Sequence, residues 1–315
     1  MKKHLIIFLT ALSLVSCRKQ VADYETPEFE AKPILNAILT AGEPVWAQVS
    51  LAQGLNSVHT ALCHDADVLF FVDGEYAEKL YYDWGTGLYK GNTIAECGKR
   101  YSCKVAVAGH DTLCASTNMP DIPRIKEVEI YEYGGITYDN ESRPLFFVTF
   151  ATDPTMLLYY QINIAGVLWQ CNGWYSVRYS GVVTESHTND DAVLLDSGTD
   201  YLIFNNSIIS DTSYRMKING EFNQIFMNLA EEQPVAEPLH GKIVVHMDGL
   251  SESLYKYLKS YYSYVENDAH DNLFLGVTTP FNYYSNVENG YGIFGARACY
   301  VSDTINYNEE LRIRN

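Results

Sequence analysis

Positive charge is scarce in this chain of 315 residues, which has 22 Lys and Arg against 39 Asp and Glu. The formal net charge is −17 at pH 7. Nucleic acids and anionic membrane surfaces are polyanions that bind clustered Lys and Arg. The composition therefore excludes nucleic acid as an expected partner and argues against electrostatic binding to an anionic membrane surface.

Familiar catalytic and metal-binding patterns are also missing. The sequence has no G-x-S-x-G nucleophile elbow and no C-x₂-C pair with the spacing of a zinc site. A G-x-G-x-x-G pattern occurs at Gly290–Gly295, but an expected strand follows it where a dinucleotide site requires a helix. We expect these glycines to serve a tight turn, and we predict no enzyme activity, no catalytic residue, no metal and no cofactor.

One apolar run stands out, and it lies at the N-terminus. Two lysines precede an apolar stretch from Leu5 to Val15, which is too short to span a bilayer core of about 30 Å. This arrangement is typical of a signal peptide. Leu14-Val15-Ser16-Cys17 resembles the lipobox at which bacterial lipoprotein signal peptidase cuts. We therefore predict that residues 1–16 are removed and that Cys17 carries the lipid.

The segment after the lipobox is polar and acidic. Residues 17–30 contain four acidic side chains and Pro27, a composition typical of a flexible tether. An acylated N-terminal cysteine would hold the chain on a membrane through its lipid. We therefore expect the protein in the cell envelope, lipid-anchored to the outer membrane, on either its periplasmic or its surface face.

Six further cysteines leave two interpretations open. An even number of cysteines in an exported chain is compatible with disulfides. Free, buried cysteines are the alternative. The cysteines that could form disulfides within the first domain are Cys63, Cys97, Cys103 and Cys114.

The composition and the short alternating segments predict a mainly β protein. Tyrosine is frequent, at 25 residues, and aromatic and β-branched residues favour strands. Asp67–Val72 and Tyr76–Tyr82 read as two strands joined by Asp73-Gly74, a type I′ turn signal. We predict an immunoglobulin-like β-sandwich over residues 31–119, ending at a proline-containing boundary.

The rest of the chain, residues 120–315, is predicted to form a larger β-rich domain carrying one helix at 252–266. Ser251 is a natural N-cap, and apolar residues recur on one stripe of the helix. Its tyrosines could stack on a sugar, but we favour packing against a sheet. An acidic cluster at residues 189–200 leaves calcium binding open; its members are Asn189, Asp190, Asp191, Asp196 and Asp200.

The C-terminal block carries a family resemblance. A tyrosine-rich segment, Leu254–Tyr262, is followed by the turn sequence Ser285–Gly295, which reads SNVENGYGIFG. Near the N-terminus, Ile34–Ile38 and Val49–Leu51 match a pair of early strand motifs. With the lipobox, these features resemble the Bacteroidota lipoprotein family catalogued as domain of unknown function 4249 (DUF 4249).

This resemblance implies a function class but supplies no catalytic residues. The genes of the family commonly neighbour TonB-dependent transporters, which implies an accessory role in nutrient uptake. Our leading hypothesis is a lipid-anchored outer-membrane accessory or binding protein without catalysis, with a TonB-dependent outer-membrane β-barrel as its partner. The alternatives are a surface adhesion or matrix lipoprotein and a hydrolase with an unrecognised site.

Overall fold

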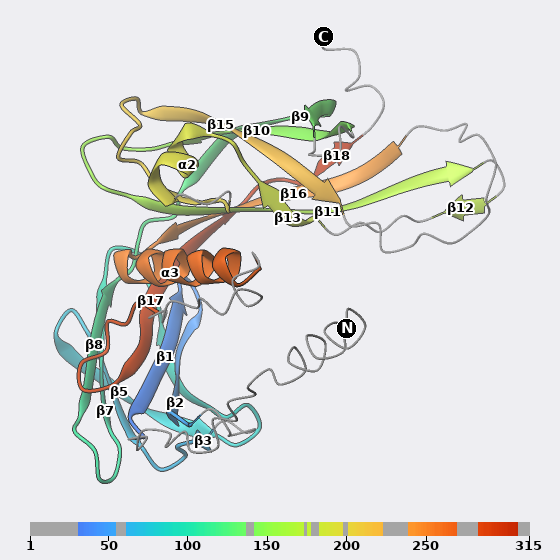
Figure 1. Cartoon of the computed structure of the whole chain (residues 1–315). Coiled ribbons are helices and arrows are strands. Elements are labelled where there is room, and N and C mark those ends of the chain that lie inside the picture. The colour runs from blue at the N-terminus through green and yellow to red at the C-terminus, as the bar shows by residue number, and fades with distance from the viewer. Residues whose placement is uncertain are drawn as a thin grey trace, which may run out of the picture.

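The computed structural model describes residues 31–54, 61–136, 142–172, 175–177, 183–197, 201–222, 239–269 and 283–307. Strands predominate in these ranges, so the mainly β prediction is confirmed (Figure 1). Two helices are present in the same ranges, α2 (Asp191–Ser197) and α3 (Glu252–Ala269). The predicted helix is α3, and the short α2 is an additional helix that the sequence did not predict. The α2 helix was missed because its seven residues are too few to show a clear helical period.

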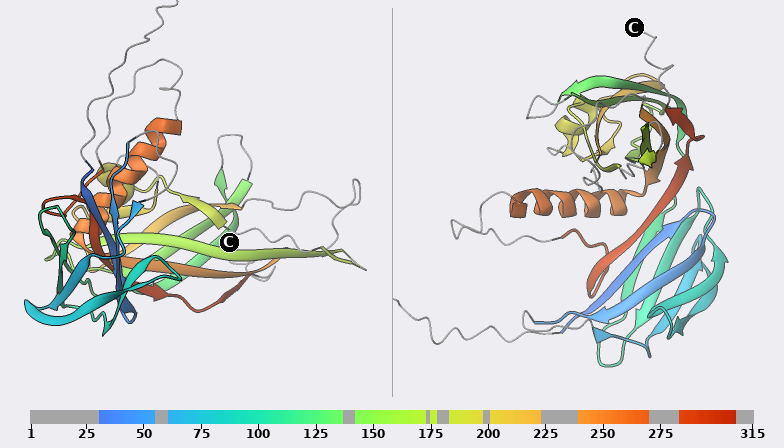
Figure 2. Two further views of the ribbon diagram at one scale, coloured as in Figure 1. Left: turned by 90° about the horizontal axis from the view of Figure 1, so that it is seen from below. Right: turned by 90° about the vertical axis from the view of Figure 1, so that its right-hand side faces the viewer.

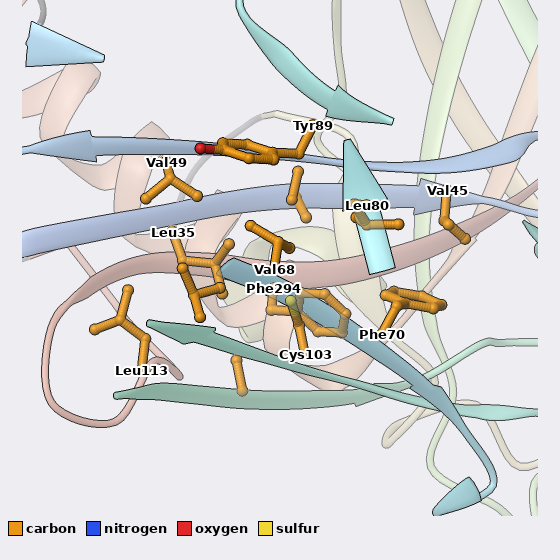
Figure 3. Packing of buried hydrophobic residues seen from close by; sticks show 14 of the residues in the cluster. Leu35, Val45, Val49, Val68, Phe70, Leu80, Tyr89, Cys103, Leu113 and Phe294 are labelled. Carbon is orange, nitrogen blue, oxygen red and sulfur yellow. The ribbon is translucent and has the colours of Figure 1, made fainter. Parts of the chain in front are cut away.

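The first half of the chain is a β-sandwich. The strand order β17-β1-β2-β6-β5-β4-β7-β8 turns back on itself, so that Phe70 of β4 faces Phe294 of β17 with ring centroids 6.3 Å apart (Figure 3). Asp73 and Gly74 both have positive φ angles, 51° and 89°, as a type I′ turn requires. The strands contributed by this half are β1 (Pro33–Thr40), β2 (Pro44–Leu51), β3 (Ala61–Leu62), β4 (Asp67–Val72), β5 (Glu75–Asp83), β6 (Leu88–Ile94), β7 (Arg100–Ala106) and β8 (Leu113–Asn118).

The second half packs a four-stranded sheet over a longer one. The order β13-β15-β10-β9 forms the smaller sheet, and β12-β11-β16 belongs to the larger one. Phe146, Phe150 and Met216 from the smaller sheet are fully buried in one core with Val245 and Met247 of the larger sheet. The strands are β9 (Arg124–Ile136), β10 (Ser142–Ala151), β11 (Tyr159–Asn172), β12 (Tyr175–Val177), β13 (Val183–His187), β14 (Ile203–Asn205), β15 (Ser213–Phe222), β16 (Leu239–Leu250) and β18 (Ile305–Tyr307).

A single strand, β17 (Tyr291–Val301), belongs to both halves. Its first part pairs in parallel with β1, from Ile34↔Tyr291 to Thr40↔Arg297. Its last part pairs with β16, from Leu250↔Arg297 to His246↔Val301. The division into 31–119 and 120–315 stays a prediction. It assigns β17 to the second domain, whereas the first part of this strand completes the first sandwich.

The α3 helix lies between the two halves (Figure 2). Ser251 caps it as predicted, since its Oγ accepts a hydrogen bond from the Leu254 N–H at 3.2 Å. The helix continues to Ala269, three residues beyond the predicted end. Among the described residues, no helix has the length and apolar character that crossing a membrane requires.

The four cysteines singled out for disulfides are free thiols. Cys103 on β7 is buried in the core, where it pairs with Ala115. Cys114 on β8 pairs with Lys104 and lies on the other face of the same sheet, because its neighbours Leu113 and Ala115 are the buried ones. Side chains on opposite faces cannot form a disulfide. Cys103 and Cys114 are therefore not paired with each other, and the assignment of Cys63, Cys97, Cys103 and Cys114 to disulfides stays a prediction beside the alternative of free cysteines.

Candidate functional site

The Asn286–Gly295 block, before and within β17, joins three elements through hydrogen bonds. The Asn286 side chain donates hydrogen bonds to the carbonyls of Ser116 (3.1 Å) and Phe294 (2.8 Å), and accepts one from the Phe294 N–H at 2.9 Å. Ser253 of α3 donates to the same Phe294 carbonyl at 3.0 Å. These bonds join β8, β17 and α3 at one point. The asparagine therefore has a structural role.

The glycines of this block permit close backbone approach. Gly292 has a φ of 118°, and a Cβ there would lie 2.1 Å from the Leu35 carbonyl oxygen. A Cβ at Gly295 would lie 2.8 Å from the Leu254 Cβ, where α3 crosses the strand. The block leads into a strand, as expected, and its glycines fit the structural role predicted for them.

Two of the five tyrosines of α3, Tyr255 and Tyr262, pack against residues of the second half. Tyr255 is 5% exposed, and its ring centroid lies 4.6 Å from that of Tyr159 on β11. Tyr262 stacks on Tyr201 at 4.4 Å, and its hydroxyl accepts a hydrogen bond from Gln161. Burial, followed by a hydrogen bond to Asp196, raises the pKa of Tyr255. These contacts support packing over sugar stacking.

The acidic residues singled out for calcium point to different partners. Asp196 accepts hydrogen bonds from the Tyr255 hydroxyl (2.5 Å), the Asn205 amide side chain (2.6 Å) and Lys259 (3.3 Å). Asp190 instead accepts from the Tyr214 hydroxyl at 2.7 Å and caps α2 through the Ala192 N–H.

Protein donors therefore occupy oxygens that calcium would require. Within the described ranges, no three His, Cys, Asp or Glu side chains form a group that could hold a metal. Asp200 lies outside the described residues.

A buried polar cluster lies where β16 meets β17. Asp248 is 4% exposed and is cross-strand partner to Cys299, while the Cys299 Sγ lies 4.0 Å from His246 Nδ1. Arg297 Nη1 lies 3.5 Å from Asp248 Oδ2, and Oδ1 of the same carboxylate is buried with no hydrogen bond. Burial and a hydrogen bond to Asp248 raise the pKa of Cys299 to about 12. The thiol is held protonated, which is the opposite of what a nucleophilic cysteine needs.

A polar hollow of about 360 Å³ lies at the end of the sandwich where β1 begins. Lys32 and Tyr291 contribute to its wall, and the Lys32 Nζ lies 5.8 Å from the Tyr291 ring centroid. The remaining lining residues are Pro33, His110, Asp111, Asn289 and Gly290. A lone carboxylate beside a histidine in an exposed turn gives no arrangement of base, nucleophile and oxyanion donor.

Comparison with known families decides the affiliation of the chain. The family model described as Domain of unknown function (DUF4249) matches residues 20–300. The chain belongs to this family. The match confirms the resemblance first seen in the tyrosine-rich helix and the Asn286–Gly295 ending. In this DUF4249 protein, those two motifs meet at the Phe294 carbonyl.

Other known proteins add little. No curated protein matches the chain. A β-glucuronidase of glycoside hydrolase family 2 is 12% identical to this chain, with a TM-score of 0.23. The match covers 69% of this chain and 19% of the β-glucuronidase. A Corynebacterium diphtheriae protein described as membrane-anchored is 11% identical, with a TM-score of 0.21. That match covers 71% of this chain and 55% of the Corynebacterium protein. The chain thus spans about a fifth and about half of these proteins, and such low scores carry no argument about function.

The site residue predicted from the sequence differs from the polar residues that the structure brings together. Cys17, the predicted lipidation site, lies outside the described residues. The Asp248–Cys299 pair went unnoticed because it depends on strand register across 51 positions of sequence. Only the even spacing of His246 and Asp248, which places both on one face of β16, could have indicated the cluster.

Proposed function

We propose that this DUF4249 protein is a lipid-anchored accessory protein of the outer membrane that assists a TonB-dependent uptake system by binding and does not itself catalyse a reaction. Cys17 holds it to the membrane through acyl chains. The folded body then presents its surfaces to a β-barrel partner or to the partner's ligand.

One observation carries this proposal: the chain enters the folded body at one end of the sandwich, and the second half lies at the other end. β1 begins at Pro33, shortly after the acidic tether, whereas the connection to β9 leaves β8 at the far end, beside the Asp73-Gly74 turn (Figure 1). A lipid on Cys17 would therefore hold the first half near the bilayer and project the second half away from it.

The polar clusters of the body support binding over catalysis. The carboxylates of Asp190 and Asp196 accept hydrogen bonds from protein donors. The Cys299 thiol has a raised pKa. Each cluster joins neighbouring elements, which suits a rigid body that presents surfaces.

Co-purification tests the proposal. The full chain with a C-terminal affinity tag is extracted from native membranes in mild detergent and purified. We expect a stoichiometric β-barrel partner, and we expect its yield to fall when Cys17→Ser removes the anchor. Recovery of the lipidated chain alone, with no barrel partner, would contradict the accessory role.

The membrane face is a separate question that protease shaving of intact cells answers. Digestion of the body in intact cells would place it on the surface, and protection until the outer membrane is permeabilised would place it in the periplasm. Either result is compatible with the anchor, whereas loss of the chain into the medium would contradict it.

A further inference from the structure

Four strands meet at the end of the sandwich where β1 begins. Ile34 of β1 pairs with both Tyr291 of β17 and Ser50 of β2, and Ser50 pairs with Leu62 of β3. The β5–β6 turn reaches the same level, because a Cβ at Gly87 would lie 2.9 Å from Leu62 Cδ1. We call this region the tether-end surface and define it by Lys32, Leu62, His64, Trp84 and Tyr291.

This surface exposes large apolar and aromatic side chains. Trp84 at the β5–β6 turn is 76% exposed, Tyr291 is 50% exposed, and Leu62 is 37% exposed. The Trp84 ring packs edge-on against the Tyr82 ring, with centroids 5.0 Å apart. The centroid of the His64 ring lies 5.0 Å from that of Trp84. Exposed aromatic and apolar side chains grouped in one region, unlike single ones, are typical of an interaction surface.

Hydrogen bonds to Asp83 hold the turn that carries Trp84. Asp83 accepts hydrogen bonds from the Gly85 N–H (2.9 Å), the Thr86 hydroxyl (3.0 Å) and the Lys90 ammonium (2.5 Å). These hydrogen bonds lower the pKa of Asp83 to about 2, and the bond from Lys90 has the largest effect. The tryptophan is thus held in place before any partner arrives, which reduces the entropy lost on binding.

We propose that the tether-end surface is a second membrane contact, at which Trp84, Tyr291 and Leu62 insert into the interfacial region of the bilayer that holds the Cys17 lipid. This inference rests on the proposed lipid anchor. Tryptophan and tyrosine prefer the membrane–water interface, because their rings are apolar while their N–H and O–H groups reach water.

The length of chain before β1 makes this contact geometrically available. Pro33 lies 16 positions after Cys17, so the tether holds the start of β1 within about 55 Å of the bilayer even when fully extended. The nearest part of the body is then the tether-end surface. An anchored surface also meets the bilayer at a high effective concentration.

The charges around the tether-end surface indicate which lipid headgroups it would contact. Lys32 and Lys90 are basic, and the ion pair between Lys90 and Asp83 removes one negative charge. Asp65 and Asp111 remain in neighbouring turns, so the surface has no net positive charge that would attract anionic lipid. Zwitterionic headgroups are therefore the expected contact.

Fluorescence quenching from within the bilayer tests the contact. The full lipidated chain is reconstituted into phosphatidylcholine vesicles with or without brominated acyl chains. The Trp84→Phe variant, measured in parallel, isolates the contribution of Trp84. We expect bromine to reduce that contribution about twofold or more, because an interfacial tryptophan lies within reach of the acyl chains.

A matched variant provides the control. Tyr76 is an exposed aromatic residue, 59% exposed, near the opposite end of the sandwich. A tryptophan introduced there in the Trp84→Phe background is expected to give no quenching. Equal quenching at both positions would overturn the proposed membrane contact. The absence of quenching at Trp84, in a chain that floats with the vesicles, would also overturn the contact but not the lipid anchor. A chain that does not float with the vesicles would overturn the lipid anchor itself.

Discussion

At the scale of single residues, steric limits explain the glycines of the C-terminal block. β17 lies so close to β1 that a side chain at Gly292 would overlap the Leu35 carbonyl. A backbone oxygen cannot move away as the end of a flexible side chain can. The positive φ of Gly292 adds a second penalty for any other residue. Glycine is therefore required at this position by the packing of β17 on β1.

Gly292→Ala is accordingly expected to destabilise the protein by at least about 2 kcal/mol, through overlap and backbone strain. Urea unfolding followed by circular dichroism measures the loss. Gly54→Ala is the matched control, since a Cβ there would meet nothing within 4 Å. Equal stability of the two variants would show that β17 does not approach β1 as described.

The Cys299 thiol supplies a pH-dependent prediction. Because its pKa is raised to about 12 in the folded chain, the reactive thiolate is scarce at pH 8 and increases only as the pH rises towards that value. Iodoacetamide labelling followed by mass spectrometry should show slow modification of Cys299 at pH 8. In urea, where its pKa returns to the ordinary range, labelling should accelerate. Rapid labelling of the folded chain at pH 8 would indicate an activated cysteine and favour the hydrolase alternative.

At the scale of elements, local signals were predicted well and long-range pairing was not. Asp73-Gly74 specified its hairpin because two positive φ angles in a row demand such residues. Ser251 marked the start of α3 because a hydroxyl there satisfies a free backbone N–H. The strand β6 and the helix α2 carried no comparable signal. Nothing local in Asn36 or Ile293 indicates that they are partners across 257 positions of sequence.

The Ser251 side chain has two roles, so its loss should be costly. Its Oγ accepts hydrogen bonds from the Leu254 N–H in α3 and from the Ala296 N–H in β17. We expect Ser251→Ala to cost about 2 kcal/mol, because both buried N–H groups lose a partner.

A variant on the same helix serves as the comparison. Lys256→Ala removes an exposed ion pair with Glu252 and a cation–π contact with the Tyr284 ring, and should stay within about 1 kcal/mol of the parent. Thermal or urea unfolding of the two variants measures both values. A Ser251→Ala variant as stable as Lys256→Ala would show that the joint between α3 and β17 is weaker than its geometry indicates.

At the scale of the whole molecule, β17 makes the two halves depend on each other. Phe294 and Ala296 are fully buried in the core of the first half, yet they lie near the end of the chain. A division by sequence alone cannot find such a strand, because it assumes that neighbours in sequence share a core. The proposed anchor, by contrast, rests on the sequence alone, since a lipobox acts through its local residues.

A fragment of residues 31–119 is therefore expected not to fold stably. Without β17 it lacks Phe294 and leaves β1 unpaired along one edge, which favours aggregation. Circular dichroism and thermal unfolding of the fragment test this expectation, with the mature full chain as the comparison. A cooperative transition at the temperature of the full chain would show that the first half is an independent domain.

The identity of the mature N-terminus tests the central claim most directly. The protein is purified from its native membrane, and its N-terminal peptide is measured by mass spectrometry. We predict a peptide that begins at Cys17 and carries the mass of its acyl chains. A mature chain that begins elsewhere, or a Cys17 without lipid, would contradict the account of a membrane-anchored body.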